Sequence, residues 1–214
     1  IIPFNEDPET YVKFVSLCTK SNEMALAAKT LASMLNVPQD DIGAVNVSNA
    51  SIQPIVAFSY LRYLWRQGHD SALQQLNELA SSVSSPNSRR CDPRLTAKIY
   101  HELGSWQQKQ AFQTDADESS FATVLASYQR SAEIDPGWYK AWRSWALMHY
   151  EIVNHCERLE ASRKSKRPAG SSSKVDADPD VNGLGADCNA LLTFCSKGAA
   201  CTPTVLEELV RATI

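Results

Sequence analysis

The chain has 214 residues, of which 43% are hydrophobic and 21% charged, a composition typical of a globular domain or of part of a larger protein. Its formal net charge of −3 provides no overall basic field, so we expect no nucleic-acid partner. No apolar run reaches the roughly 18–20 residues that span a bilayer, and the start at Ile1 carries no secretory signal pattern. We therefore expect a cytoplasmic segment of a longer polypeptide, without direct membrane insertion.

Apolar residues recur at helical spacing in successive pairs of segments. The first pair is residues 9–36, which break at the polar run TKSNE and end at Asn36, and the second is residues 55–68, which end at Gly68, and 70–83. The polar residues 38–54 between the two pairs predict a loop. Residues 94–108, with a kink or end expected near Gly104, and residues 121–135 form the third pair, and a fourth begins at residue 137. No useful strand alternation is present. The sequence predicts an all-α fold, a tetratricopeptide- or HEAT-like solenoid of helical hairpins.

The composition changes after the fourth pair begins, which predicts three regions. Residues 1–157 form the helical-repeat region. Residues 158–187 are basic, then rich in Ser and Gly, then acidic, which predicts a disordered low-complexity loop. Residues 188–214 form a short C-terminal helical piece, with a helix expected over 204–212 after Pro203. Its cysteines Cys188, Cys195 and Cys201 lack the tight spacing of a zinc site, so we expect no metal.

The richest aromatic segment is residues 131–150, SAEIDPGWYKAWRSWALMHY. Pro136 fixes φ and can start a helix without losing a needed N–H group. Aromatic residues at helical spacing usually pack in a core, so we expect Trp142, Trp145 and Tyr150 to pack between helices, with Pro136 in the same structural set. The alternative is an aromatic cage for a cation, which would need an exposed concave surface.

These residues also carry a resemblance to a known family. The stretch DPGWYKAWRSWALMHYEIVNH, the run YVKFVSLCTKSNEMALAAKTL and the short motif ELGSWQ resemble the FAT domain of target of rapamycin kinases, of the phosphatidylinositol-3-kinase-related class. The resemblance covers about residues 7–157. It implies a helical scaffold that supports the kinase domain of the same polypeptide and the subunits of its complex in nutrient and growth signalling. That complex would also bring the segment to endomembrane surfaces or into the nucleus.

The resemblance implies that the parent protein is a non-specific serine/threonine protein kinase that uses ATP and Mg in its kinase domain. The chain itself has no Gly-rich phosphate loop, no His-Arg-Asp-type loop and no Asp-Phe-Gly motif. We therefore expect no catalytic residues here. The alternative interpretation is a free-standing tetratricopeptide-like adaptor that binds peptides or partner helices in a concave groove.

The resemblance further implies inositol hexakisphosphate as a ligand, at positions that correspond to Lys13, Lys20, Lys98 and Lys140. A polyphosphate needs several convergent cations, and Lys140 lies where a helix N-terminus also favours an anion. The chain departs from the family at Glu102, one helical turn from Lys98, where a carboxylate would repel phosphate or pair with Lys98. The alternative is that these lysines are ordinary solvated surface groups.

Overall fold

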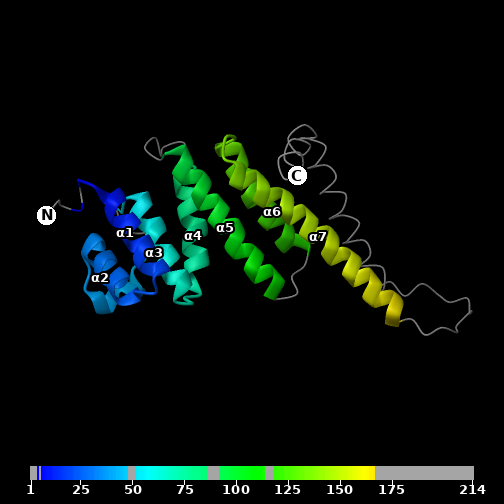
Figure 1. Ribbon diagram of the computed structural model, residues 1–214, viewed down its shortest axis with the longest axis horizontal. Helices are drawn as coiled ribbons and strands as arrows, with labels where there is room; N and C mark the ends of the chain where they lie inside the picture. The colour runs from blue at the N-terminus through cyan, green and yellow to red at the C-terminus, as the bar shows by residue number, and fades with distance from the viewer. Residues whose placement is uncertain (1–3, 5, 48–51, 86–91, 114–117, 167–214) are drawn as a thin grey trace, which may run out of the picture. The chain divides into compact units, whose positions relative to one another are not determined.

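The computed structural model describes residues 4, 6–47, 52–85, 92–113 and 118–166, and within these residues every regular element is a helix (Figure 1). The all-α prediction is confirmed. In chain order the elements are α1 (Pro8–Lys20), α2 (Met24–Leu35), the 3-10 helix η1 (Gln39–Ala44), α3 (Pro54–Arg66), α4 (Ser71–Val83), α5 (Pro93–Gln113), α6 (Glu118–Ile134) and α7 (Tyr139–Lys166). No helix in the described ranges is long and apolar enough to cross a membrane.

Local chemistry sets the ends of the first helices. Asp7 caps α1, because its Oδ1 accepts a hydrogen bond from the Thr10 backbone N–H at 3.1 Å and satisfies one of the free amides of the first turn. Asn36 ends α2 in the left-handed conformation with φ of 55°, and Gly68 follows α3 with φ of 78°. Asn and Gly tolerate this backbone region better than other residues, so both positions favour a helix end.

The chain divides into two compact units, residues 1–106 and 107–214, and the division falls inside α5. In the first unit, α1 packs on α2 and α3, and α3 packs on α4 (Figure 1). Tyr60, Leu61 and Leu64 of α3 are fully buried. Small residues such as Ala27 and Ala72 are also fully buried, which permits close approach of the helices. Residue 104 does not end α5, which continues through Gly104 to Gln113.

The connection between α2 and α3 is more ordered than its polar composition predicts. It contains η1, and both Ile42 and Val47 are buried in the core of the first unit. The Tyr60 hydroxyl reaches the Ile42 carbonyl at 2.5 Å and the Val45 carbonyl at 3.1 Å. Gln75 Oε1 accepts from the Val47 amide at 3.3 Å. These contacts from α3 and α4 hold the connection against the helices.

The described part of the second unit comprises the end of α5 with α6 and α7. Its core cluster consists of Ala111, Phe121, Val124, Leu125, Tyr128, Met148 and Ile152, with Trp145 packed against it. α7 continues to Lys166, so the helical region does not end at the expected boundary of 157. The rest of the expected loop, from residue 167, and the expected C-terminal piece, 188–214, lie outside the described residues.

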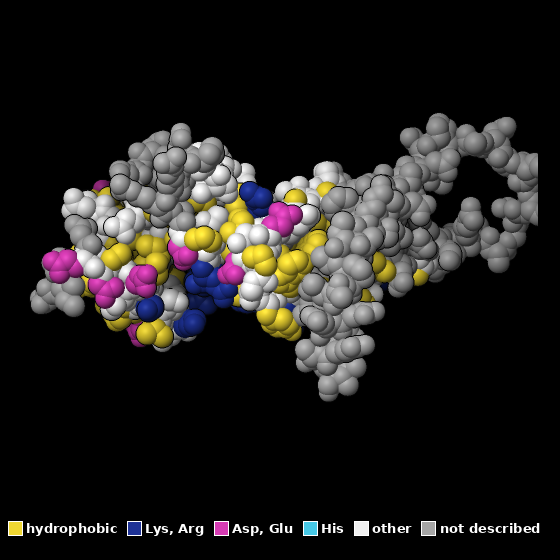
Figure 2. Space-filling model, turned by 90° about the horizontal axis from the view of Figure 1, so that it is seen from above, with side chains coloured by type: hydrophobic (Ala, Val, Ile, Leu, Met, Phe, Trp, Pro, Cys, Tyr) yellow, Lys and Arg dark blue, Asp and Glu magenta, His cyan; other side chains and the backbone are white. Residues whose placement is uncertain are grey.

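Some large hydrophobic side chains stay exposed in both units. Figure 2 shows hydrophobic side chains interspersed with charged and polar ones on the face that it presents. The exposed set is Phe14, Leu17, Leu26, Phe112, Tyr139, Leu147 and Tyr150.

Candidate functional site

The four lysines predicted to bind an inositol polyphosphate are all exposed. Lys13 and Lys20 lie on α1 and Lys98 on α5, in the first unit, whereas Lys140 lies in the first turn of α7, in the second unit. Lys13 Nζ is 4.0 Å from Glu9 Oε2, an exposed pair of the kind that contributes little to stability. Among the described residues, Lys20, Lys98 and Lys140 form no ion pair, so their charges remain available to an anion.

Glu102, the departure from the family pattern, has partners other than Lys98. Its Oε1 lies 3.5 Å from Arg62 Nε of α3 and accepts a hydrogen bond from Trp106 Nε1 at 3.3 Å. The Arg62 guanidinium also lies over the Phe58 ring, 5.8 Å from its centroid, a cation–π arrangement. The carboxylate is therefore engaged in a contact between α3 and α5, and Lys98 is not removed by pairing with it.

Trp106, in the ELGSWQ motif, is a structural residue of the first unit. Its side chain is 1% exposed. Its ring stacks on Trp65 of α3, with centroids 4.5 Å apart and planes 4° from parallel. This stack joins α5 to α3, while the hydrogen bond to Glu102, which lies one turn earlier on α5, satisfies the indole N–H group.

Gln107 and Gln108 follow Trp106 and connect helices of the second unit. Ser127 Oγ donates to Gln107 Oε1 at 2.7 Å, and the Tyr128 hydroxyl donates to Gln108 Oε1 at 2.7 Å. The Gln108 Nε2 group donates to Glu151 of α7 at 2.5 Å. One amide side chain therefore satisfies groups on α6 and α7 together. The sequence did not predict that Gln107 and Gln108 connect these helices, and its only indication was that Gln107 belongs to the ELGSWQ motif.

In the aromatic segment, Trp145 and Trp142 make contacts with the core and with the turn before α7. Trp145 packs against the core of the second unit. Trp142 is half-buried, and its Nε1 donates to the Pro136 carbonyl at 2.9 Å, which ties the start of α7 to the turn before it. The two indoles meet at a centroid distance of 5.6 Å and an angle of 57°.

Tyr150 and Pro136 differ from the expectation of packing between helices. Tyr150 is 65% exposed, because it lies on the opposite side of α7 from the buried Met148 and Ile152. Pro136 is exposed in the turn between α6 and α7, three residues before the first residue of α7, Tyr139, so it does not itself start the helix as expected. Its role in the described residues is to present its carbonyl to Trp142.

His149 lies beside Trp145 in the aromatic segment. Its ring lies 5.4 Å from the Trp145 ring in an edge arrangement. Neither ring nitrogen is solvent-accessible or has a hydrogen-bond partner within the described residues. Burial lowers the pKa of His149 below its usual 6.5, because the charged imidazolium loses hydration there.

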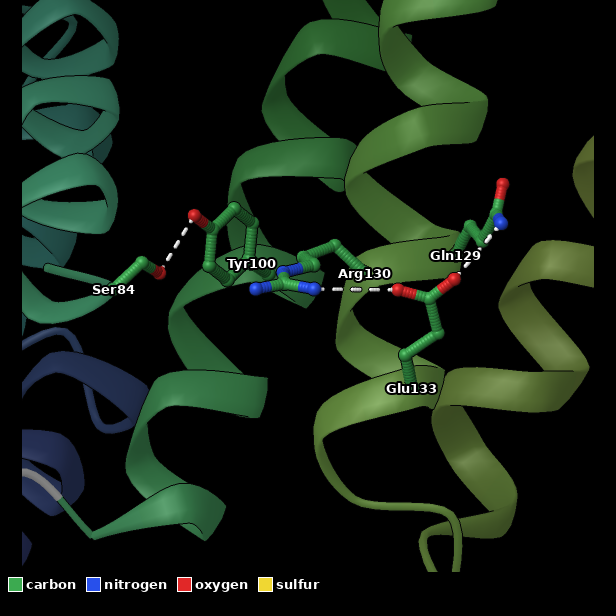
Figure 3. A network of polar contacts seen from close by, with 5 residues as sticks. All are labelled: Ser84, Tyr100, Gln129, Arg130 and Glu133. Atoms are coloured by element: carbon green, nitrogen blue, oxygen red, sulfur yellow. Dashed lines mark hydrogen bonds and ion pairs between the residues drawn. The ribbon is translucent and has the colours of Figure 1, made fainter. Parts of the chain in front are cut away.

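Figure 3 shows further polar contacts, one set in each unit. In the first unit the Ser84 hydroxyl, just after α4, lies 2.8 Å from the Tyr100 hydroxyl of α5. In the second unit Glu133 contacts Arg130 at 3.5 Å and Gln129 at 2.9 Å along α6. These contacts join neighbouring turns or helices, which is a structural role.

The arrangement has no metal-binding geometry in the part of the chain that is described. There, no group of three or more His, Cys, Asp or Glu residues could hold an ion. Cys188, Cys195 and Cys201 lie outside these residues.

Comparison with known proteins identifies the family. The FAT domain family matches residues 2–177. Serine/threonine-protein kinase TOR2 of Saccharomyces cerevisiae is 32% identical over 208 residues, which covers 86% of this chain and 8% of the yeast protein. Serine/threonine-protein kinase mTor of Drosophila melanogaster is 28% identical, with 80% of this chain and 7% of the fly protein covered.

Serine/threonine-protein kinase tor1 of Schizosaccharomyces pombe is 27% identical, over 72% of this chain and 7% of the relative. The chain thus spans less than a tenth of the length of these relatives. With this match over most of its residues and its all-helical fold, the chain belongs to the FAT domain family and is similar to that segment of target of rapamycin kinases.

Proposed function

We propose that this chain is a noncatalytic helical scaffold segment of a target of rapamycin-like serine/threonine kinase. The observation that carries the proposal is the FAT domain match over residues 2–177, together with relatives that are named serine/threonine-protein kinases. In this proposal the phosphotransfer from ATP and Mg belongs to a kinase domain elsewhere in the same polypeptide. The work of the present segment is mechanical.

The contacts between helices support a mechanical role. Buried side chains such as Trp106 and Leu125 fill the two cores. The amide of Gln108 and the carboxylate of Glu102 are both engaged between helices. Stacked helices of this kind provide extended surfaces that can hold a kinase domain and the subunits of a complex in place. We propose a cytoplasmic setting, in nutrient and growth signalling.

An experiment on the intact polypeptide tests the scaffold role. Trp106→Ala should lower both the recovery of the assembled complex and its phosphotransfer, because it removes a buried contact between α3 and α5. Gln129→Ala, on the exposed side of α6, is the control and should leave both unchanged. The present chain alone should transfer no phosphate from ATP. Phosphotransfer by the chain alone, or full assembly of Trp106→Ala, would contradict the proposal.

We also propose an inositol polyphosphate as a structural ligand of the segment. The support is that Lys20 and Lys98 of the first unit, and Lys140 of the second, are each exposed cations without ion-pair partners in the described ranges. Glu102 is engaged by Arg62. When bound, the ligand would supply negative charge that neutralises lysines of this set.

Mass spectrometry of the purified intact polypeptide should then detect a co-purifying inositol phosphate. Lys98→Glu should reduce its amount, whereas Lys29→Glu, an exposed lysine of α2 outside the proposed set, should not. Absence of the ligand, with no change in thermal stability when inositol hexakisphosphate is added, would remove this part of the proposal and leave the scaffold role standing.

A further inference from the structure

α7 has one buried side and one exposed side that is also hydrophobic. Met148 and Ile152 are fully buried, and along this side α7 packs on α6 (Figure 1). On the opposite side Tyr139 is 53%, Leu147 42% and Tyr150 65% exposed. Large hydrophobic side chains that are exposed together on one helix face, rather than singly, mark a surface that binds another molecule.

The exposed side of α7 also carries positive charge. Helical spacing of three and four residues places Lys140 and Arg143 on the same side as Tyr139, Leu147 and Tyr150. Both cations are exposed, and neither forms an ion pair within the described residues. We call these five residues the outer face of α7.

Acidic residues do not balance this charge along the helix. Residues 139–150 contain no Asp or Glu. The next residue, Glu151, accepts a hydrogen bond from Gln108 Nε2 of α5 at 2.5 Å, so its carboxylate is engaged on another helix. The outer face therefore offers two free cations beside an apolar stripe, and its complement is an apolar stripe beside carboxylates.

The composition of the outer face favours a protein partner over a lipid surface. Tyr and Arg are enriched at the centres of protein–protein interfaces, where they carry much of the binding energy. A helix that lies on a membrane instead separates its Lys and Arg residues from its apolar residues, on opposite sides. In α7 the cations and the exposed apolar residues share one side, and the other side is covered by α6.

The fold favours a helix as the partner element. In the first unit α3 packs on α1, α2 and α4, so a helix of this fold can be covered on more than one side by other helices. On α7 the small side chain of Ala146 is half-buried beside Leu147. A small residue at this position lets the backbone of a second helix approach closely.

We propose that the outer face of α7 binds an amphipathic helix of a partner protein whose apolar stripe is flanked by Asp or Glu. Contact with Leu147 and Tyr150 supplies most of the affinity, and pairing of a carboxylate with Arg143 steers the encounter and fixes the register. A second copy of the same face is disfavoured, because a twofold contact would bring like charges together. This surface rests on the proposed scaffold function and deepens it by naming the chemistry of one partner.

A display library of helical peptides tests the proposal. Each peptide has about 20 residues, with leucine at helical spacing on one side and random residues next to this stripe. Selection on the immobilised 214-residue chain should enrich Asp and Glu at the random positions at least about fivefold over Lys and Arg, because the surface that they flank is basic.

Fluorescence anisotropy with one selected peptide then locates its binding site. Leu147→Gln and Tyr150→Gln should each weaken binding at least about tenfold, because each puts a polar amide into the apolar contact. Leu26→Gln is the matched control, since Leu26 of α2 is 43% exposed against 42% for Leu147, and binding should be unchanged. Circular dichroism checks that each variant is folded, and two variants on one face keep the test decisive if one of them unfolds.

A charge exchange tests the electrostatic part of the proposal. Arg143→Glu should weaken binding of the selected peptide about tenfold, and a peptide with Lys in place of its Glu residues should recover the loss. Arg143 is chosen over Lys140 because Lys140 also belongs to the set proposed for the inositol polyphosphate.

Several results would each overturn the proposal. They are a selection that yields no binder, enrichment of Lys and Arg, and binding that both Leu147→Gln and Tyr150→Gln leave unchanged. Self-association of the chain that Leu147→Gln abolishes would indicate a second copy as the occupant. Binding to vesicles of phosphatidylcholine and phosphatidylserine that Leu147→Gln abolishes would indicate a lipid surface. These assays measure neither phosphotransfer nor assembly of the complex, so a failure here is distinct from a failure of the scaffold function.

Discussion

Replacing Trp106 with alanine should destabilise the first unit more than any other single tryptophan replacement on the described helices. The side chain is 1% exposed, and a buried tryptophan removes roughly 150–250 Å² from water. At about 25 cal/mol per Å² this corresponds to about 4–6 kcal/mol. Large-to-small replacements of Phe or Trp in cores cost about 3–5 kcal/mol, so both routes give a loss near 4 kcal/mol.

Two specific contacts are lost with the ring. The stack on Trp65, at 4.5 Å and 4°, contributes about 0.5–1.5 kcal/mol beyond burial. The bond from Nε1 to Glu102 also disappears, although Glu102 keeps Arg62 as its partner. Trp106→Phe retains an aromatic ring but no N–H donor, so we expect a loss of about 1–3 kcal/mol for it.

Urea denaturation followed by circular dichroism measures the free energy of unfolding of each variant. Trp142→Ala is the matched control, because Trp142 is half-buried and its N–H bonds a backbone carbonyl in the second unit, and it should lose about 1–2 kcal/mol. An equal loss of unfolding free energy for Trp106→Ala and Trp142→Ala, with an unchanged slope of that free energy against urea concentration, would refute the assignment of Trp106 as the central contact between α3 and α5.

Three further predictions concern polar groups. Tyr60→Phe removes the hydroxyl contacts to the connection between α2 and α3 and should lower the free energy of unfolding by about 1–2 kcal/mol. Burial raises the pKa of Tyr60 to about 12, so the neutral form is favoured in the folded state. The stability that the neutral hydroxyl contributes is complete below pH 10 and is lost as the pH rises towards 12. Urea denaturation at increasing alkaline pH should show this decline, and Tyr60→Phe should lack it. Gln108→Leu leaves Tyr128 and Glu151 without their shared partner and should cost about 1–3 kcal/mol, whereas the exposed Gln129→Leu should change the denaturation curve by less than about 0.5 kcal/mol. Burial lowers the pKa of His149, so the unfolded state binds a proton more readily and stability should fall as the pH drops below 6.5. His149→Gln should flatten this slope in thermal melts at pH 5–7, and an unchanged slope would argue against a buried neutral imidazole.

The amphipathic periods and the end signals of the sequence were sufficient to predict the helices. Asn36 and Gly68 mark helix ends because they adopt positive φ at low cost, and both do so here. Residues 39–47 show where this reasoning fails. Their polar composition predicts a loop, but Ile42 and Val47 are buried, because Tyr60 and Gln75 of distant helices bond to their backbone.

The candidate site likewise has features that the sequence predicted and features that it did not. The motif ELGSWQ contributed to the resemblance to the family, but it did not indicate that Trp106 stacks on Trp65 or that Gln108 connects α6 and α7. Glu102 was expected to affect Lys98, one turn away on the same helix, and instead it pairs with Arg62 of α3. A pattern along one helix reports neighbours within that helix and cannot reveal which charge another helix brings closer.

By itself the sequence determined the helical class, the approximate helix ends and the family, because these depend on local periodicity, on capping residues and on short motifs. Only the tertiary structure decided which aromatic residues are buried and which polar groups are engaged. Trp145 and Tyr150 illustrate the difference, since both lie on α7 at helical spacing, yet one packs on the core and the other is 65% exposed. Which side of a helix is covered depends on where its neighbours pack, and that is a property of the assembled fold.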